Sequence, residues 1–306
     1  MRTFCCLISF VIIQLQGFSQ IPVVSAGTIS HYENFSSQFV TARNVDVWLP
    51  DDFSSQKKYS VLYMHDGQML FDTTNNWNKQ EWGVDETIGK LLKENKIRDC
   101  IVVGIWNTQF RHPEYFPQKA QEYLTECQIN DLMQSTRTEG APSLLGEGPI
   151  SDDYLQFLVR ELKPFIDKTY PTLSTPENTF IAGSSMGGLI SMYAICEYPD
   201  VFGGAACLST HWPGIFYVEN NPAPGAFLEY LNDHLPSPEN HKFYFDFGTE
   251  TLDSLYEPFQ LQADEIMKNK GYTTINWLTK KFPGENHSEK AWKKRLEIPI
   301  VFLLGK

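Results

Sequence analysis

The chain has 306 residues, of which 42% are hydrophobic and 20% are charged, a composition typical of a globular protein and not of a disordered one. It contains 25 Lys and Arg against 37 Asp and Glu, and this acidic excess, a formal net charge of −12, is spread along the chain. A nucleic-acid partner is therefore not expected. The length is sufficient for one sizeable core.

Residues 1–19 have the composition of a secretory signal peptide. Arg2 supplies a positive charge, residues 4–15 form a mostly apolar run, and the small residues Gly17 and Ser19 follow. The apolar run is too short to span a bilayer, and no later segment reaches the roughly 18 to 20 apolar residues that a membrane helix needs. We therefore expect an exported protein, periplasmic or secreted, without stable membrane insertion and with a single domain over residues 20–306.

The rest of the chain predicts an α/β fold. Residues 38–49 alternate apolar and polar side chains, which indicates antiparallel strands at a sheet edge. Later apolar runs are short and lack this alternation, as strands buried on both faces of a parallel sheet do. They cover residues 59–64, 100–105, 179–182, 204–208 and 242–247. Segments with helical spacing lie between them, so we predict a mostly parallel central sheet with helices on both faces.

A sharp turn between a predicted strand and a predicted helix carries the candidate nucleophile. Gly-Ser-Ser-Met-Gly-Gly at positions 183–188 contains the pattern Gly-x-Ser-x-Gly, centred on Ser185. Glycines are needed there because side chains beside the strained serine would collide with the strand and the helix. The turn also places the backbone N–H of Met186 at a helix N-terminus, where it can stabilise an oxyanion.

A serine nucleophile needs a base and an acid that orients it, in the chain order Ser, acid, His. His287 lies in a loop between a predicted strand, residues 274–281, and a helix beginning near Ser288, so we assign it as the base. Two carboxylates follow the strand at residues 242–247. We favour Asp253, which has room to fold back towards an imidazole, and keep Glu250, nearer the strand end, as the alternative.

The loop after residues 59–64 is expected to supply the second oxyanion donor. It contains His65-Asp66-Gly67-Gln68, and we assign the Gln68 N–H to this role, with Gly67 allowing close approach to the substrate oxygen. His65 and Asp66 lack further ligands at metal spacing, so no metal site is expected. No cofactor is required either.

Two further loops follow predicted strands and are expected to shape the pocket. We assign His211 and Trp212 to the substrate pocket, with plain packing in the core as an equal alternative for Trp212, and expect Arg111 to form an ion pair with Glu114. The four cysteines beyond the signal segment form no closely spaced pair, which argues against a zinc or redox motif, and one disulfide remains open. They are Cys100, Cys127, Cys196 and Cys207.

Together these motifs resemble the esterase family of α/β-hydrolases that includes enterochelin, feruloyl and acetylxylan esterases and the esterase D and antigen 85 groups. The matching strings lie at residues 62–68, 183–188, 245–253 and 284–287. The resemblance implies an α/β-hydrolase fold without a large lid and a Ser-His-acid mechanism acting on an ester, but it does not name the substrate. We expect a small-molecule or carbohydrate ester. Because the acid varies in position among members, Asp253 and Glu250 both stay open.

The expected reaction is hydrolysis of a carboxylic ester through an acyl-enzyme, with a carbohydrate, hydroxycinnamate or siderophore ester as the substrate. One alternative is an acyltransferase that passes the acyl group to a sugar or lipid alcohol. A second is a binding module that retains the fold without turnover.

Overall fold

The computed structural model describes residues 21–306 except 75, 77, 137, 139 and 217–219. The predicted signal peptide lies outside these residues. No helix in the described part of the chain is both long and apolar enough to cross a bilayer.

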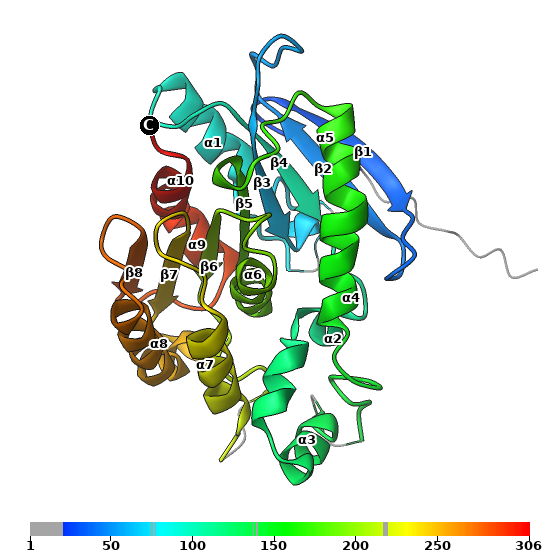
Figure 1. Cartoon of the computed structure of the whole chain (residues 1–306). Helices are drawn as coiled ribbons and strands as arrows, with labels where there is room; N and C mark the ends of the chain where they lie inside the picture. The colour runs from blue at the N-terminus through cyan, green and yellow to red at the C-terminus, as the bar shows by residue number, and fades with distance from the viewer. Residues whose placement is uncertain (1–20, 75, 77, 137, 139, 217–219) are drawn as a thin grey trace, which may run out of the picture.

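One mixed eight-stranded sheet organises the chain (Figure 1). Its strands lie in the order β1-β2-β4-β3-β5-β6-β7-β8; β1 and β2 pair antiparallel, as do β2 and β4, and all other neighbours pair in parallel. The strands are β1 (Thr28–Phe35), β2 (Arg43–Leu49), β3 (Ser60–His65), β4 (Cys100–Ile105), β5 (Thr179–Ser184), β6 (Gly204–Leu208), β7 (Lys242–Gly248) and β8 (Trp277–Phe282). Parallel strands place all their following loops at one edge of the sheet.

Helices connect the strands and cover both faces of the sheet. They are α1 (Val84–Lys93), α2 (Arg111–Tyr115), α3 (Glu126–Met133), α4 (Ser151–Gln156), α5 (Lys163–Thr169), α6 (Met186–Glu197), α7 (Ala223–His234), α8 (Glu257–Asn269), α9 (Glu289–Arg295) and α10 (Glu297–Leu304). A π-helical stretch at Phe157–Leu162 joins α4 to α5, so the three form the long helix seen in Figure 1. Shorter 3-10 helices include Gly67–Met69 after β3 and Thr251–Leu255 after β7.

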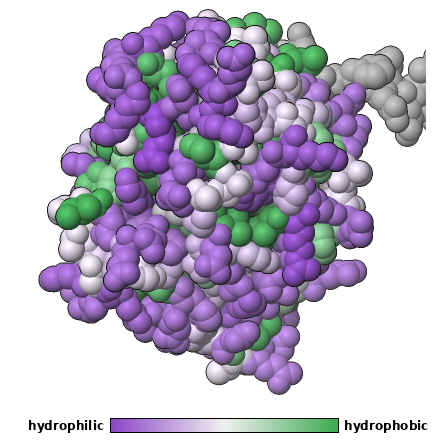
Figure 2. All heavy atoms as spheres, turned by 45° about the horizontal axis from the view of Figure 1, so that its top comes forward, coloured by the Kyte–Doolittle hydropathy of each residue, from purple (hydrophilic) through white to green (hydrophobic). Residues whose placement is uncertain are grey.

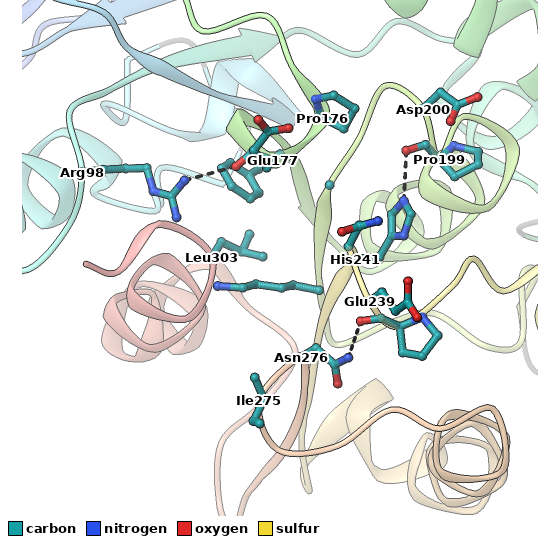
Figure 3. A pocket seen from close by; sticks show the side chains of 15 residues that line it. Arg98, Pro176, Glu177, Pro199, Asp200, Glu239, His241, Ile275, Asn276 and Leu303 are labelled. Atoms are coloured by element: carbon teal, nitrogen blue, oxygen red, sulfur yellow. Dashed lines mark hydrogen bonds between the residues drawn. The ribbon is translucent and has the colours of Figure 1, made fainter.

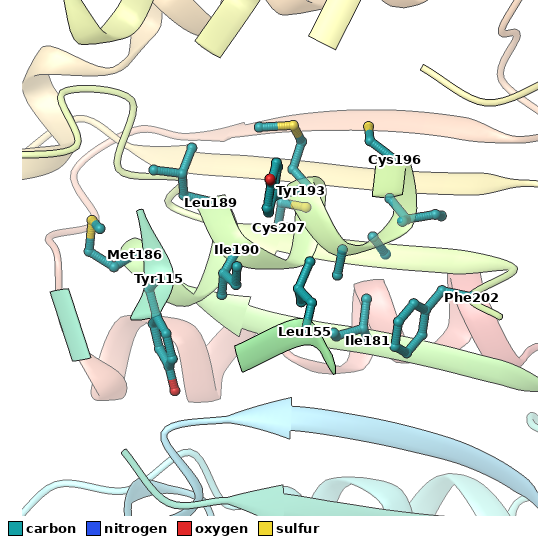
Figure 4. Packing of buried hydrophobic residues seen from close by; sticks show 14 of the residues in the cluster. Tyr115, Leu155, Ile181, Met186, Leu189, Ile190, Tyr193, Cys196, Phe202 and Cys207 are labelled. Carbon is teal, nitrogen blue, oxygen red and sulfur yellow. The ribbon is translucent and has the colours of Figure 1, made fainter. Parts of the chain in front are cut away.

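Two apolar layers flank the sheet because successive strand residues point to opposite faces. Tyr63 of β3 faces the layer that contains α4 to α8, whereas the next residue, Met64, faces the layer with α1, α9 and α10. Helix α6 is buried on nearly all sides, and Figure 4 shows Leu189, Ile190 and Tyr193 packed beside the sheet. The sheet edge that carries the long loops is therefore held by a rigid core.

The predicted α/β class is confirmed, and the strands at residues 100–105 and 204–208 have the predicted bounds. The N-terminal region differs in detail. It forms two strands, β1 and β2, and β1 begins ten residues before the predicted alternation, at Thr28. Figure 2 shows one face of the molecule, where hydrophobic residues form small groups among hydrophilic ones, as on the exterior of most globular domains.

Candidate active site

Two large cavities lie at opposite edges of the sheet. The larger, about 780 Å³, is lined by residues at the starts of strands, such as Phe180 and Lys242, together with Arg98 (Figure 3). The other, about 670 Å³, is lined by both Ser185 and His287. Ligands of α/β sheets bind beyond the carboxyl ends of the strands, so the second cavity is the candidate active site.

Ser185 occupies a strained backbone conformation between β5 and α6. Its φ of 59° and ψ of −123° lie outside the regions that ordinary residues favour. The backbone holds this shape from two sides, because the Ser185 N–H donates to the Leu208 carbonyl at 2.9 Å and its carbonyl accepts from the His211 N–H at 3.1 Å. Ser185 lines the cavity at this turn, the position that the sequence predicts for a nucleophile.

The glycines of this turn are required by close backbone approach. A Cβ on Gly183 would lie 2.7 Å from the Gly187 carbonyl, and one on Gly188 would lie 3.1 Å from the Leu208 carbonyl oxygen. Gly187 in turn lies against His65 and Asp66, where a Cβ would come within 3.3 to 3.4 Å. The absence of side chains therefore brings the loop after β3 beside the N-terminus of α6.

His287 and Asp253 are joined by a short hydrogen bond. Nδ1 of His287 lies 2.6 Å from Oδ1 of Asp253. Asp253 is 1% exposed, and its Oδ2 accepts from the Ser209 hydroxyl and the Gly248 N–H, both at 2.6 Å. Burial alone would raise the pKa of Asp253, but the hydrogen bonds from His287, Ser209 and Gly248 outweigh it and lower that pKa below its usual value.

The loop after β7 and the loop after β8 are fastened together by hydrogen bonds. The N–H groups of Thr249 and Glu250 both donate to the Glu285 carbonyl, and the His287 N–H donates to the Thr251 hydroxyl at 2.9 Å. Glu250 takes part in this contact through its backbone N–H, and the residue is exposed to solvent. Of the two carboxylates predicted as the acid, the structure therefore brings Asp253 to His287.

Both predicted oxyanion donors lie at the same edge. Met186 is the first residue of α6, where a helical N–H has no partner inside the helix, and its side chain is buried in the core. Gln68 lies in the 3-10 helix after β3 and lines the cavity. Gly67 is also required by packing, because a Cβ there would lie 2.6 Å from the backbone of Gly104 in β4.

Arg111 holds the loop after β3 from the side. Its Nε and Nη2 donate to the two carboxylate oxygens of Asp66, each at 2.7 Å, and the Asn107 side chain adds a bond of 2.6 Å. Burial acts to raise the pKa of Asp66, but Arg111 and Asn107 lower it by more. The pKa of Asp66 therefore lies below its usual value. The expected Arg111 pair with Glu114 is wrong, because Glu114 is buried against Arg43 at 2.9 Å.

Comparison with known proteins identifies the family of the chain. The profile of the family described as "Putative esterase" matches residues 36–297. The chain belongs to this esterase family. It is 21% identical to Bacillus subtilis YbbA, over 86% of this chain and 93% of that protein.

Solved structures show the same fold. A ferulic acid esterase superposes with a TM-score of 0.61 at 18% identity, over 91% of this chain and 98% of its own. The enterobactin esterase FES from Shigella flexneri gives 0.63 at 17% identity, over 92% of this chain and 60% of its own. The chain is a carboxylic ester hydrolase with an α/β-hydrolase fold.

The two residues predicted to line the substrate pocket, His211 and Trp212, do not line the cavity. Trp212 is 0% exposed; it packs on Phe245 with ring centroids 6.3 Å apart, and its indole N–H donates to Gln260 at 3.2 Å. Its polar atom is satisfied inside the core, so the pocket assignment of Trp212 is wrong. An aromatic residue in the loop after a strand can pack into the core or face the pocket, and the sequence alone does not distinguish these two orientations.

His211 lies behind Ser185 and is not among the residues that line the cavity. Its Nε2 lies 3.0 Å from the Ile215 carbonyl and must carry the proton, which leaves Nδ1 to accept from the Tyr256 hydroxyl at 2.8 Å. Burial lowers the pKa of His211 to about 3, so the imidazole is neutral. The predicted pocket role of His211 is therefore wrong, because its ring bonds Tyr256 and Ile215 beneath Ser185.

The cavity walls include residues that the sequence did not single out. Trp82 and Trp292 form a tilted pair with centroids 5.4 Å apart, and Trp292 also meets the His287 ring edge to face at 5.0 Å. Carboxamide side chains supply much of the remaining wall. These are Gln68, Asn78, Gln80, Asn107 and Gln109. Gln68 belongs to the predicted string at residues 62–68, whereas the loops of the other four carry no motif, so only their position after strands could have indicated them.

The four described cysteines have free thiols, so no disulfide joins them. Cys100, Cys196 and Cys207 are buried, and burial raises the pKa of each thiol. They act as small packing residues.

Proposed function

We propose that this esterase hydrolyses its ester through an acyl-enzyme formed on Ser185. His287 is the base, Asp253 orients it, and the N–H groups of Met186 and Gln68 bind the oxyanion. The observation that carries the proposal is that Ser185 and His287 line one cavity while Asp253 bonds the far nitrogen of the imidazole.

The direction of the hydrogen bond between His287 and Asp253 determines what the imidazole can do. An ionised carboxylate only accepts, so Nδ1 carries the proton and donates to Asp253. Nε2 is then unprotonated and available to accept the proton of Ser185. When that proton arrives, the carboxylate stabilises the imidazolium that forms.

In the first step the Ser185 oxygen attacks the ester carbonyl and its proton passes to His287. Charge develops on the carbonyl oxygen, which the Met186 and Gln68 N–H groups stabilise. The tetrahedral intermediate expels the alcohol, which takes the proton from His287. Water, activated by the same imidazole, then attacks the acyl-enzyme and releases the acid, which restores Ser185.

The cavity walls favour an ester that carries hydroxyl groups. Carboxamides both donate and accept hydrogen bonds, which suits hydroxyl groups of either orientation. The rings of Trp82 and Trp292 add flat apolar surface suited to a sugar or an aromatic acyl group. We propose a carbohydrate, hydroxycinnamate or siderophore ester; the names of the two structural relatives point to esters of ferulic acid and enterobactin.

Labelling with a fluorophosphonate probe tests the nucleophile. The wild type is expected to label and to hydrolyse p-nitrophenyl acetate and methyl ferulate, and Ser185→Ala to lose both, with a rate loss of about a thousandfold or more. Ser184→Ala is the matched control, because it removes the neighbouring serine from the same cavity wall. Labelling that persists in Ser185→Ala but not in Ser184→Ala contradicts the assignment.

The same assays distinguish the alternatives. A folded wild type that neither labels nor turns over any of these esters would be a binding module. An acyltransferase would form a new ester when a sugar or lipid alcohol is added, at the expense of the free acid.

A further inference from the structure

A buried serine lies directly behind Asp253. Ser209 follows β6 with a left-handed φ of 41° and is 0% exposed. Its N–H donates to the backbone carbonyl of Asp246 at 2.8 Å and to that residue's carboxylate at 3.1 Å. The backbone is thus fixed, and the hydroxyl is held at one place beside Asp253.

Three groups surround the Ser209 hydroxyl, and together they leave it one orientation. The Trp292 indole N–H and Nη2 of Arg295 each lie 2.9 Å from Oγ, and both groups can only donate. They occupy the two lone pairs of the oxygen. The hydroxyl proton must therefore go to Oδ2 of Asp253, at 2.6 Å.

Arg295 supplies positive charge to this network without binding Asp253 directly. Its Nε and Nη2 lie 3.1 and 2.9 Å from the two carboxylate oxygens of Asp246, whereas Nη2 lies 3.9 Å from Asp253. Ser209 bridges the remaining gap. The charged or titratable groups that face Asp253 are His287, Arg295 and Tyr256, with Asp246 behind Arg295.

We propose that Ser209 is a positioning residue of the catalytic site, which holds the carboxylate of Asp253 in the orientation that directs Oδ1 to His287. Trp292 and Arg295 fix the direction of the Ser209 hydroxyl. Trp292 also lines the substrate cavity, so the network connects the cavity wall to the acid. This inference rests on the proposed function, since it assigns a partner to the proposed acid.

The test is the pH–rate profile of Ser209→Ala. Asp253 then has one donor fewer, and its carboxylate attracts the shared proton more strongly, so the His287–Asp253 pair takes up a proton at higher pH. The ascending limb of kcat/KM is expected to move up by about half a pH unit or more. Oδ2 of Asp253 is then held by the Gly248 N–H alone, so the carboxylate is less firmly oriented. We expect kcat to fall about ten- to a hundredfold while KM changes less than about twofold.

Ser60→Ala is the matched control. Ser60 is equally buried and donates one hydrogen bond, to Asn178 at 2.9 Å, but lies at the start of β3, at the opposite sheet edge. It should lower the melting temperature without changing the pH profile. If Ser209→Ala fails to fold, Ser209→Gly carries the same test, because glycine tolerates the left-handed φ.

The two proposals fail in different ways. A folded wild type that neither labels nor hydrolyses esters overturns the proposed function. A wild type that labels and turns over, together with a Ser209 variant that keeps both its kcat and its pH profile, overturns only the role of Ser209, whatever the loss of stability.

Discussion

Asp253 meets Nδ1 of His287 at 2.6 Å, although Glu250, three residues earlier, is nearer the end of β7. The 3-10 turn at Thr251–Leu255 buries Asp253 and leaves Glu250 exposed. We therefore expect Asp253→Asn to lower kcat about a thousand- to ten-thousandfold, because the amide favours the wrong imidazole tautomer. Initial rates on p-nitrophenyl butyrate measure this loss.

Glu250→Gln is the control, since its backbone N–H, which bonds the Glu285 carbonyl, is retained. Its kcat should stay within about threefold of the wild type. A larger loss in Glu250→Gln than in Asp253→Asn, with both variants folded, would assign the acid to Glu250.

Arg111→Ala should reduce both stability and turnover. It leaves the buried Asp66 carboxylate without its two-pronged partner, next to the loop that carries Gln68. The pair is partly exposed, so we expect a loss of about 1 to 3 kcal/mol, less than for a fully buried pair, and a fall in kcat of about tenfold or more.

Urea unfolding and initial rates measure the two effects of Arg111→Ala. Arg111→Lys should restore only part of each, because an ammonium cannot reproduce the paired geometry. Lys281→Ala, which removes an exposed ion pair with Glu257, should change stability by less than about 1 kcal/mol. Full recovery in Arg111→Lys would show that charge alone is sufficient.

Gly183→Ala should be strongly destabilising. The added Cβ would meet the backbone of Gly187 at 2.7 Å, where no flexible side chain can move aside. The cost is expected to be about 1 to 3 kcal/mol or more, with loss of fluorophosphonate labelling as the turn deforms. Thermal unfolding and labelling are measured on the same preparation.

Gly225→Ala is expected to change stability in the opposite direction. Gly225 lies in α7 with nothing within 4 Å of a Cβ, so alanine should stabilise the protein by about 0.5 to 1 kcal/mol through helix propensity. Equal changes in stability in Gly183→Ala and Gly225→Ala would contradict the packing argument for Gly183.

Stability should decline with acid from about pH 6.5 downward. Burial lowers the pKa of both His65 and His211 to about 3, so the unfolded chain takes up protons first as the pH falls. Their contribution is complete above the unfolded pKa of about 6.5 and is lost progressively towards pH 3. Each adds a slope of at most about 1.4 kcal/mol per pH unit.

Urea unfolding at pH 7.5, 6.5, 5.5 and 4.5 gives this slope. His65→Gln removes one titrating group and should lower the slope by about one proton, while its amide can still bond the Tyr154 hydroxyl, which lies 2.8 Å from His65. An unchanged slope in His65→Gln would show that His65 does not take up a proton on unfolding.

Local sequence patterns were sufficient for the central strands and the nucleophile turn. Strands at residues 100–105 and 204–208 are apolar throughout because both faces are covered, and their ends coincide with the loss of that pattern. The glycine pattern around Ser185 spans six residues, although Gly187 and Gly188 also pack against His65 and Leu208. Both patterns can be recognised from neighbours in the chain.

The errors concern side chains whose partners are distant in sequence. Glu114 is near Arg111 along the chain, but the structure pairs Arg111 with Asp66, 45 residues away. Trp212 turns into the core because Gln260, 48 residues away, satisfies its indole. Choosing between these orientations requires the arrangement of the strands, which periodicity does not give.

His287, the proposed base, follows β8, one of the two outermost strands of the sheet, which pairs with β7 and has two exposed residues. An outermost strand opens at lower free energy than the strands inside the sheet. Fraying of β8 would carry His287 away from Asp253 while the central strands keep their pairing. On gradual warming, catalytic activity is therefore expected to disappear before the far-ultraviolet circular dichroism signal changes.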